Sequence, residues 1–519
     1  MPDVSPLSPP NATLPALVAA ACRWRHHQPL LCDAQLRLTG RDCTERLARL
    51  DMALEKLGVG SGTTVAILAG SAVATALVLF AASARGATCC FLHTYEREEN
   101  NADVLRAIGA RLLIAGPQDI YRGKGERIAA AADIALAMVD AQATGLTVLR
   151  PGAVGSGARR PIGADDPAML LLSSGTTGKP KVVVHTHRTL VAVAGAGTPI
   201  YGRCTEDDRI AVGMQPSFAA WIFTMLPFFT ARALIVFSEW TNADDYLALL
   251  ARERITMAAL VPTVWRMVLA AGPEAYDLAA LQVAFFSGEP GSQSLVEALA
   301  RIAPDVRTAY LASEIGCACG IAAGLDVLRQ PGKAACVGRP VPGGDVRLID
   351  PESATLRDVA PGETGEIAVR GPSLALGYWN NEPLTVARFG DGWWRSGDLG
   401  QIDADGYVFV KGRLDNRINS GGIKIHAEEV EAVLLSHPQI AMAAVVGEPD
   451  EQWGERVVAH VVARNGSLTV DAVLAHCAGG TLSSRKIPKA VYFHDRLPTG
   501  PTNKLLRQAL RQKGRSDAQ

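Results

Sequence analysis

The sequence predicts an α/β protein with a large N-terminal domain of parallel-rich sheets and helices, a small β-rich subdomain, and a small mobile α+β domain at the C-terminus. Short apolar strands alternate with helical patterns from residue 40 to about residue 320, an order typical of parallel sheets covered by helices. From about Val337 the pattern changes to short strands separated by Gly and Pro, and after Arg413 to helix, strand, strand and helix. We therefore expect a first domain at residues 1–413, with its β-rich part at about 337–413, and a second domain at residues 414–519, small enough to move as a unit.

The expected elements follow one another in a regular order. In the large domain the strands read AQLRLT, TVAIL, ATCCFL, LLIAG, AMLLLSS, RIAVGM, ALIVF, MAALV, VAFFSG and VRTAYLA. The β-rich part adds DVRLID, GEIAVRG and GYVFVKG, and the last domain has the helix HAEEVEAVLLSH, the strands IAMAAVVGE and RVVAHVVAR, and a final helix. In sheets of this class binding sites gather at the carboxyl ends of strands. The segments that follow these strands are therefore the first candidates for a site.

Residues 65–84 carry no charge and are long enough to span a bilayer. The segment divides at Gly70-Ser71, into the strand TTVAIL and an apolar helix that ends at Gly86, and the strand ATCCFL follows. Glycine directly after the last helical residue is a common helix end. We therefore expect a buried β-α-β unit here and no membrane span.

The composition excludes several classes of protein. Of the 519 residues, 48% are hydrophobic and 20% are charged, as in a globular protein. The formal net charge of −1 gives no reason to expect a nucleic-acid partner, which requires clustered Lys and Arg. The ten cysteines contain no CxxC pair and predict neither a disulfide framework nor a zinc site. Because the N-terminus lacks the pattern of a secretory signal, we expect a cytoplasmic protein. We also expect a monomer or a homodimer.

Residues 171–187, LLSSGTTGKPKVVVHTH, place hydroxyls, glycines and two lysines directly after an apolar strand. Glycines let successive backbone N–H groups turn toward one anion, and hydroxyls add donors without bulk. The spacing differs from that of the common P-loop, because only two residues separate Gly175 from Gly178. From these residues alone two interpretations stay open, a phosphate-binding loop and a surface loop.

The wider string Ser-Gly-Thr-Thr-Gly-Lys-Pro-Lys, followed by a strand and Thr186-His187, resembles the phosphate loop of the adenylate-forming superfamily, which includes the acyl-CoA synthetases. Further motifs of that superfamily recur in order along about residues 40–510. They are Tyr310-Leu311-Ala312-Ser313-Glu314, Gly365-Glu366-Ile367 with Gly377-Tyr378, Trp394-Arg395-Ser396-Gly397-Asp398, Gly412-Arg413-Leu414-Asp415, Gly421-Gly422 with Glu428-Glu429-Val430-Glu431, and residues 498–504.

The resemblance implies an enzyme, an AMP-forming acid–thiol ligase of the acyl-CoA synthetase type. It would use ATP and Mg²⁺ to convert a hydrophobic carboxylic acid to an acyl-adenylate with release of pyrophosphate, and would then transfer the acyl group to the thiol of CoA. Two alternatives stay open. One is a stand-alone adenylating enzyme that loads a separate acyl carrier protein. The other, a catalytically silent nucleotide-binding protein, predicts loss of Lys504, Glu314 or Asp398, and all three are present.

The resemblance assigns the nucleotide to several separate segments. The glycine-rich loop would hold the β- and γ-phosphates, Tyr310 and the segment after Ser287 would enclose adenine, and Asp398 and Arg413 would bind the ribose. The nucleotide-binding residues implied are Ser173, Ser174, Gly175, Thr176, Thr177, Gly178, Lys179, Lys181, Gly288, Glu289, Pro290, Tyr310, Leu311, Ala312, Ser313, Asp398, Arg413 and Lys504.

The catalytic residues implied are Lys504, Glu314 and Thr176. Glu314 would be the metal ligand, because Mg²⁺ prefers hard oxygen donors. Lys504, whose ordinary pKa of about 10.4 makes it a cation at neutral pH, would reach both the substrate carboxylate and the α-phosphate. The sequence departs from the usual motifs at Val182, at Leu311-Ala312 and at Asn503, and none of these departures removes a charged catalytic group.

Asp415 matches the hinge of the superfamily, where the last domain rotates between an adenylating and a thiolating arrangement. In the second arrangement Gly421 and Gly422 would line a tunnel for the pantetheine arm of CoA, because they lack side chains. Lys424 would lie near this arm. The alternative for the two glycines is a plain hairpin turn.

The substrate is the least defined part of the prediction. Amino-acid-activating relatives place an Asp after the aromatic residue of the segment QPSFAAW, whereas Ala219 follows Phe218 here. We therefore expect an aryl, polycyclic or medium-chain acid. Trp221, Phe223 and Trp265 would wall an apolar cavity, unless they are simply core. The pocket residues expected are Phe218, Ala219, Trp221, Ser287, Gly288, Ser313 and Gly316.

Overall fold

The computed structural model describes residues 12–173, 180–353, 355–464, 466, 468–479, 482–499 and 505–513. The chain forms two compact units. The first contains the described residues up to Val346 together with Val369–Trp394, and the second contains Arg347–Ala368 and the described residues from Arg395 onward. The compact units therefore do not divide at Arg413. The boundary between residues 413 and 414 stays a prediction, because compactness does not show where a chain pivots.

The first unit contains two large sheets. The first sheet has nine strands in the order β16-β15-β14-β13-β12-β10-β11-β1-β2. Its central strands run parallel, and β2, β15 and β16 are antiparallel at the two edges. The strands are β1 (Pro29–Cys32), β2 (Arg37–Thr39), β10 (Arg209–Val212), β11 (Leu234–Phe237), β12 (Met257–Leu260), β13 (Val283–Ser287), β14 (Asp305–Tyr310), β15 (Ile321–Ala323) and β16 (Arg339–Pro340).

The second sheet has eight strands in the order β19-β9-β8-β4-β3-β5-β6-β7. Strands β8, β4, β3, β5 and β6 are parallel, and β7, β9 and β19 are antiparallel to their neighbours. The strands are β3 (Thr64–Leu68), β4 (Thr88–Phe91), β5 (Leu112–Ala115), β6 (Ala135–Val139), β7 (Leu146–Arg150), β8 (Pro167–Ser173), β9 (Lys181–Thr186) and β19 (Gly377–Tyr378). The prediction of parallel-rich sheets is confirmed.

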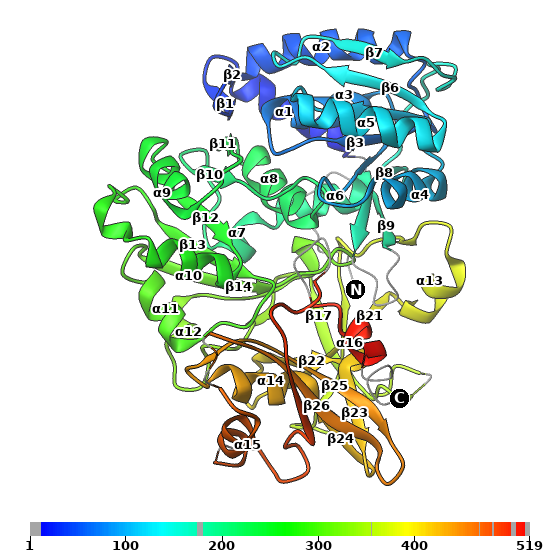
Figure 1. The fold of residues 1–519 in the computed structure, drawn as a ribbon. Helices are drawn as coiled ribbons and strands as arrows, with labels where there is room; N and C mark the ends of the chain where they lie inside the picture. The colour runs from blue at the N-terminus through cyan, green and yellow to red at the C-terminus, as the bar shows by residue number, and fades with distance from the viewer. Residues whose placement is uncertain are drawn as a thin grey trace. The chain divides into compact units, whose positions relative to one another are not determined.

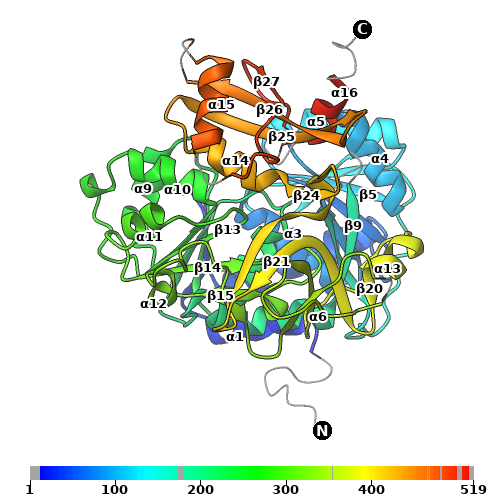
Figure 2. The same ribbon diagram turned by 90° about the horizontal axis from the view of Figure 1, so that it is seen from below.

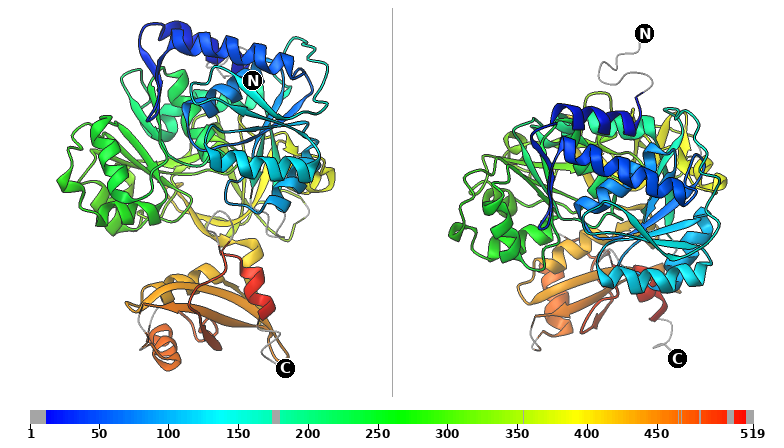
Figure 3. Two further views of the ribbon diagram at one scale, coloured as in Figure 1. Left: turned by 45° about the horizontal axis from the view of Figure 1, so that its top comes forward. Right: turned by 90° about the horizontal axis from the view of Figure 1, so that it is seen from above.

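Helices cover both faces of these sheets. Figure 1 shows α9 to α12 in green beside the strands of the first sheet, and in the right panel of Figure 3 α1 and α2 lie side by side in dark blue. The helices of this unit are α1 (Leu14–Trp24), α2 (Gly40–Lys56), α3 (Val73–Ala84), α4 (Glu98–Ile108), α5 (Asp119–Ala132), α6 (His187–Gly195), α7 (Gly197–Tyr201), α8 (Ala219–Thr230), α9 (Ala243–Arg252), α10 (Pro262–Ala270), α11 (Gln293–Leu299), α12 (Leu325–Leu328) and α13 (Glu382–Arg388), with short 3₁₀ turns at Pro273–Ala275 and Cys317–Cys319.

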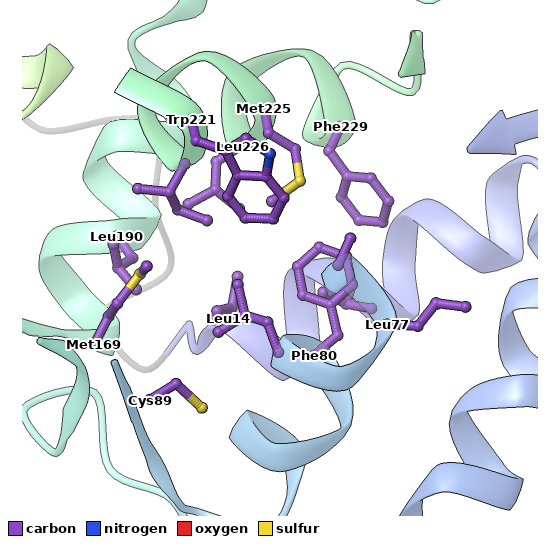
Figure 4. Packing of buried hydrophobic residues seen from close by; sticks show 14 of the residues in the cluster. Leu14, Leu77, Phe80, Cys89, Met169, Leu190, Trp221, Met225, Leu226 and Phe229 are labelled. Carbon is purple, nitrogen blue, oxygen red and sulfur yellow. The ribbon is translucent and has the colours of Figure 1, made fainter. Parts of the chain in front are cut away.

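The main core of the first unit lies where α1, α3, α6 and α8 pack between the two sheets. Figure 4 shows Leu14, Phe80, Trp221 and Phe229 meeting there, and the ring centroids of Phe80 and Phe229 are 5.1 Å apart. A second core cluster, on the other face of the second sheet, joins it to α4 and α5. Helices α3 and α8 are apolar on nearly every side because they are enclosed by sheets and helices.

The uncharged segment at residues 65–84 divides as predicted, into β3 and α3, and β4 follows. Strands β3 and β4 pair in parallel, so the segment is a β-α-β unit of the second sheet. Among the described residues, none of the helices combines the length and the apolar character that a membrane crossing requires.

The third sheet combines three strands predicted in the β-rich part with two, β20 and β21, that were not predicted. Its order is β17-β18-β21-β20, and β22 pairs with β21. The strands are β17 (Asp345–Ile349), β18 (Gly365–Arg370), β20 (Phe389–Gly390), β21 (Trp393–Ile402) and β22 (Val408–Arg413). Strands β17, β18 and β22 correspond to the predicted segments DVRLID, GEIAVRG and GYVFVKG.

The fourth sheet lies in the second unit and has the order β24-β23-β26-β25, with β27 beside β26. Alternate residues of its central strands face opposite sides: Val445 packs toward α14 and α15, and Val446 packs toward Leu510 of α16. Figures 1 and 2 show these helices on the two faces of the sheet. The elements are a 3₁₀ turn at Leu414–Asn416, β23 (Arg417–Ser420), β24 (Ile423–His426), α14 (Ala427–Leu435), β25 (Ile440–Asp450), β26 (Gly454–Ala463), α15 (Val470–Gly479), β27 (Ala490–Phe493) and α16 (Arg507–Lys513).

Candidate functional site

Glu314 lies in the turn that follows β14, at the carboxyl end of a parallel strand, and it is only 7% exposed. The backbone around it is held by three hydrogen bonds. His185 Nε2 donates to Ser313 O at 2.7 Å, Ala375 N donates to Glu314 O at 2.8 Å, and Ser373 Oγ donates to Ile315 O. These bonds satisfy three successive carbonyl groups, so the turn has one defined position.

The carboxylate of Glu314 accepts a hydrogen bond from a tyrosine. Tyr378 Oη donates to Glu314 Oε1 at 2.9 Å, and Trp394 Nε1 donates to Tyr378 Oη at 3.4 Å. Burial, followed by the nearby charge of Glu314, raises the pKa of Tyr378, so the phenol stays protonated at neutral pH. The ammonium nitrogen of Lys181 lies 5.9 Å from the centre of the Tyr378 ring.

His185 is a neutral support for this turn. It is fully buried in β9, and burial lowers its pKa to about 4. A backbone carbonyl only accepts, so the neutral ring carries its proton on Nε2, toward Ser313 O. Within the described part of the chain, no group of three or more His, Cys, Asp and Glu side chains is placed to hold a metal ion.

The segments predicted to enclose adenine end two neighbouring strands. Strands β13 and β14 pair in parallel with Ser287 opposite Ala309, so Gly288 follows β13 beside Tyr310 of β14. Gly288 has a φ of 87°, which favours glycine. Glu289 Oε2 accepts from Thr263 N and from Thr263 Oγ1 at 2.7 Å, at the start of α10. The strand pairing places the two segments side by side, and Glu289 joins the first of them to α10. Their role in adenine binding stays a prediction.

Some of the predicted residues lie outside the described part of the chain. These are Ser174, Gly175, Thr176, Thr177, Gly178 and Lys179 of the phosphate loop, and Lys504. The described residues on either side of the loop are paired in the second sheet, where Ser173 of β8 lies opposite Lys181 of β9.

In the second unit, Asp398 and Arg413 form an ion pair. They are register partners on β21 and β22, and Arg413 Nη1 lies 2.8 Å from Asp398 Oδ1. The turn that carries Asp398 is held by Glu366, which is 1% exposed. Glu366 accepts from Gly397 N at 2.9 Å and pairs with the guanidinium of Arg395 at 2.7 Å. The resemblance to the superfamily predicts that Asp398 and Arg413 bind the ribose. The structure places the two side chains in contact, and their role in ribose binding stays a prediction.

The predicted hinge residue, Asp415, lies in the 3₁₀ turn at Leu414–Asn416, directly before β23. Arg413 Nη2 lies 3.9 Å from Asp415 Oδ2, and Arg511 of α16 donates to Asp415 O at 3.2 Å. The turn therefore connects β22 to the fourth sheet without regular strand pairing of its own. Its role as a hinge stays a prediction.

Gly421 and Gly422 form the two-residue turn between β23 and β24. Their φ values of 57° and 82° are those of a tight hairpin that favours glycine at both positions. A Cβ atom on Gly421 would lie 2.6 Å from the ring of Trp453, whereas one on Gly422 would meet no atom within 4 Å. Lys424, near the turn, pairs with Glu352 at 3.2 Å. A plain hairpin turn is thus enough to explain why both positions are glycine. The tunnel for the pantetheine arm stays a prediction.

The residues predicted to line a substrate pocket differ in their exposure. Phe218 and Ala219 are half-buried, but Trp221 is 0% exposed and its Nε1 donates to Ser71 Oγ at 3.0 Å. Phe223 and Trp265 are buried as well. These three aromatic side chains belong to the packed interior, which favours the interpretation that they are core residues. A substrate pocket lined by Trp221 stays a prediction.

Gly316 occupies a place that only glycine fits. Its φ is 60°, and a Cβ atom there would lie 2.7 Å from Val193 Cγ2 and 3.1 Å from Ser373 Cβ. The close approach lets the turn after Glu314 pack directly onto α6.

Sequence reasoning missed the supporting residues. Tyr378, Trp394, Glu366 and Arg395 were quoted only as parts of motifs, and His185 only as a residue beside the loop. Nothing in their spacing indicates their partners, because Tyr378 is 64 residues from Glu314 and His185 is 128 residues from Ser313. A charged residue inside an apolar strand, such as Glu366 in β18, is the one signal that could have indicated a paired charge.

Comparison with known proteins shows the family of the chain. A family model described as "AMP-binding enzyme" matches residues 18–379, and one described as "AMP-binding enzyme C-terminal domain" matches residues 429–504. A feruloyl-CoA synthase of Amycolatopsis sp is 32% identical over 488 residues, which are 92% of this chain and 94% of that protein. A fatty acid–acyl-carrier-protein ligase of Streptomyces coeruleorubidus is 33% identical over 358 residues, which are 67% of this chain and 68% of that protein.

The fold agrees with that of a solved structure. The o-succinylbenzoate CoA synthetase from Bacillus subtilis, in complex with its acyl-adenylate intermediate, superimposes with a TM-score of 0.84 at 24% sequence identity. The match covers 96% of this chain and 98% of that one.

Proposed function

Because the chain belongs to the adenylate-forming superfamily of AMP-binding enzymes, we propose that it activates a hydrophobic carboxylic acid with ATP and transfers the acyl group to the thiol of CoA. In the first half-reaction the carboxylate attacks the α-phosphate, pyrophosphate leaves, and an acyl-adenylate forms. In the second the thiol attacks the acyl carbonyl and AMP leaves. Two anions meet in the first half-reaction, so the site must offset the negative charge of the phosphates.

The observation that carries this proposal is the placement of Glu314. It is a buried carboxylate at the carboxyl end of β14, beside the segments at Ser287 and Tyr310. Mg²⁺ is commonly bound by one or two carboxylates together with the phosphates of its substrate, and a single fixed carboxylate oxygen fits that requirement. Mg²⁺ bound there would screen the charge of the phosphate chain.

The other proposed groups come from several separate segments of the chain. Asp398, held by Arg413 at 2.8 Å, would accept hydrogen bonds from the ribose hydroxyls. Lys504 would bind the substrate carboxylate and the α-phosphate, and the loop that contains Thr176 would bind the β- and γ-phosphates. Rotation at Asp415 would withdraw Lys504 after adenylation and bring Gly421, Gly422 and Lys424 to the thiol. A Lys504→Ala variant should then lose adenylation and keep thiolation of a preformed adenylate.

The names of the relatives support a hydrophobic acid as substrate. Ferulate is an aryl acid and a fatty acid is aliphatic, and two relatives at 32% and 33% identity carry these names. An amino acid stays unsupported, since Ala219 follows Phe218. We take CoA as the acceptor, and a separate acyl carrier protein is the alternative that the second relative favours. We place the reaction in the cytoplasm, where ATP and CoA are available, with the protein as a monomer or a homodimer.

The experiment that tests the function is a screen for pyrophosphate release over aryl, polycyclic, medium-chain and long-chain acids, with and without CoA. We expect release that depends on ATP, Mg²⁺ and one class of acid, and a thioester of the expected mass when CoA is added. Glu314→Gln should abolish the release, and Glu297→Gln, an exposed carboxylate on α11, should not. Nucleotide binding without acid-dependent release from any member of the panel would favour a catalytically silent protein.

A further inference from the structure

The hydrogen bond to Glu314 has a direction that is fixed by a second donor. Tyr378 Oη lies 2.9 Å from Glu314 Oε1, and Trp394 Nε1 lies 3.4 Å from the same Tyr378 Oη. An indole N–H only donates, so Tyr378 Oη accepts from Trp394. The single phenolic proton is then available to the carboxylate, which accepts it. Trp394, Tyr378 and Glu314 thus form a chain of hydrogen bonds with one direction.

We propose that Tyr378, supported by Trp394, is a positioning residue that fixes the side chain of Glu314 for the Mg²⁺ of the Mg–ATP complex. The proposal deepens the proposed function and rests on it. A glutamate side chain has three rotatable torsions, so a buried backbone alone leaves its carboxylate several orientations. Partners that hydrogen-bond a metal ligand select one orientation, and their loss typically weakens metal binding or activity about 10- to 100-fold.

Tyr378 is itself held in place by the backbone. It lies opposite Val183 in the pairing of β19 with β9, and its N–H donates to Thr385 Oγ1 at 2.9 Å. The preceding residue, Gly377, has a φ of 145°, and a Cβ atom there would lie 2.5 Å from Thr385 Cγ2. A side chain at Gly377 would therefore collide with Thr385, the residue whose hydroxyl holds the N–H of Tyr378.

Strand β9 connects the two supports of Glu314. Its residue Val183 sets the register of Tyr378, which binds the carboxylate, and His185 binds the carbonyl of Ser313 at 2.7 Å. The same strand directly follows the glycine-rich loop at residues 174–179 in the sequence. One strand therefore fixes both the backbone and the side chain of the proposed metal ligand, and the proposed phosphate loop is attached to its start.

A purely structural role for Tyr378 makes a different prediction. If its hydroxyl only satisfies a buried carboxylate, Tyr378→Phe lowers the stability of the first unit and leaves metal binding unchanged. If it positions Glu314, the variant weakens the binding of the metal in the presence of ATP and leaves metal-free binding of ATP unchanged.

The test is a titration of Mn²⁺ into the full-length protein with ATP, followed by electron paramagnetic resonance, together with calorimetric titration of ATP without metal. We expect Tyr378→Phe to weaken Mn²⁺ binding about tenfold and to bind metal-free ATP as the unchanged protein does. The matched control is Tyr276→Phe, which removes another tyrosine–carboxylate hydrogen bond, at 3.1 Å to Asp244, and should leave both quantities unchanged.

Two further variants keep the proposal testable. In Glu314→Gln protein, Tyr378→Phe should cause no further loss of Mn²⁺ binding, because the two groups act as one unit. Trp394→Phe keeps the tyrosine and its packing, and it should weaken Mn²⁺ binding in the same direction but less, so it decides the matter if Tyr378→Phe does not fold.

Unchanged Mn²⁺ binding in folded Tyr378→Phe, or in Trp394→Phe where that is the variant that folds, overturns the proposal. So does an equal loss in the presence and absence of Glu314. Failure of the proposed function would look different, because the unchanged protein would then show no acid-dependent release of pyrophosphate at all. If the unchanged protein is active and Tyr378→Phe binds Mn²⁺ normally, the positioning role is contradicted and the proposed function is not.

Discussion

Glu314 and the hairpin at Gly421 and Gly422 are assigned to the two half-reactions, and the protein holds them in different ways. Glu314 is 7% exposed, and its backbone and carboxylate are fixed by His185, Ser373 and Tyr378. Lys424 beside the hairpin is about half exposed and pairs with Glu352, whose side chain is 59% exposed. The residue proposed to bind the metal ion is thus fixed by interior hydrogen bonds. The residues proposed to serve the pantetheine arm lie near the surface, where ion pairs contribute little.

The largest effect is expected at Glu314 itself. Glu314→Gln keeps the hydrogen bond from Tyr378 to an oxygen but removes the negative charge that Mg²⁺ requires. We expect the rate of pyrophosphate release to fall by at least about 100-fold, with the unfolding midpoint little changed. A variant with nearly normal release at saturating Mg²⁺ would remove Glu314 from the catalytic set.

The next effect is expected at Gly316, which joins the Glu314 turn to α6. Gly316→Ala combines a φ of 60° with a Cβ 2.7 Å from Val193 Cγ2, so we expect a loss of about 1–3 kcal/mol in the free energy of unfolding. Gly332→Ala is the control, with a φ of 77° and no atom within 4 Å of the added carbon. Urea unfolding followed by fluorescence measures both. Equal losses would mean that the close approach to Val193 adds nothing to the strain.

A smaller and more selective effect is expected at the hairpin. Gly422→Ala meets no atom within 4 Å, so it should leave adenylation unchanged and raise KM for CoA severalfold if the turn lines a tunnel. Gly392→Ala, another glycine with a positive φ and open space around it, is the control. An unchanged KM for CoA would establish Gly421 and Gly422 as a plain hairpin turn.

The smallest effect is expected at Glu352. Glu352→Gln removes the ion pairs with Arg417 and Lys424, in which the Glu352 side chain is 59% exposed although that of Arg417 is only 15% exposed. Exposed pairs are screened by water and salt, so the unfolding midpoint and both half-reactions should stay as they are in the unchanged protein. A changed ratio of adenylation to thiolation would instead show that this pair stabilises one arrangement of the C-terminal part.

Local patterns sufficed to predict most of the fold. Strands such as β3 and β12 are short apolar runs between turn residues, and the order of strands and helices indicates parallel sheets. Glu314, Asp398 and Arg413 were found through their motifs, and the structure places the last two in contact at 2.8 Å. The helix α1 and the strand β1 precede the range in which the alternation was recognised.

The supports of the site could not be predicted, because they depend on contacts between distant strands. The pairing of Tyr378 with Val183 and the bond from His185 to Ser313 follow from the order of strands in the second sheet and from its packing against the first unit's other elements. Trp221 illustrates the opposite difficulty. An aromatic residue beside a loop has the same sequence pattern whether it lines a pocket or lies in the core, and here it is fully buried.

The most direct test of the central claim is a single turnover without CoA, analysed by mass spectrometry, with the acid that gives the strongest pyrophosphate release. The account predicts an adduct of that acid with AMP in amounts equal to the pyrophosphate released, and its loss in Glu314→Gln. Formation of ADP and phosphate with no such adduct would contradict adenylation as the reaction of this protein.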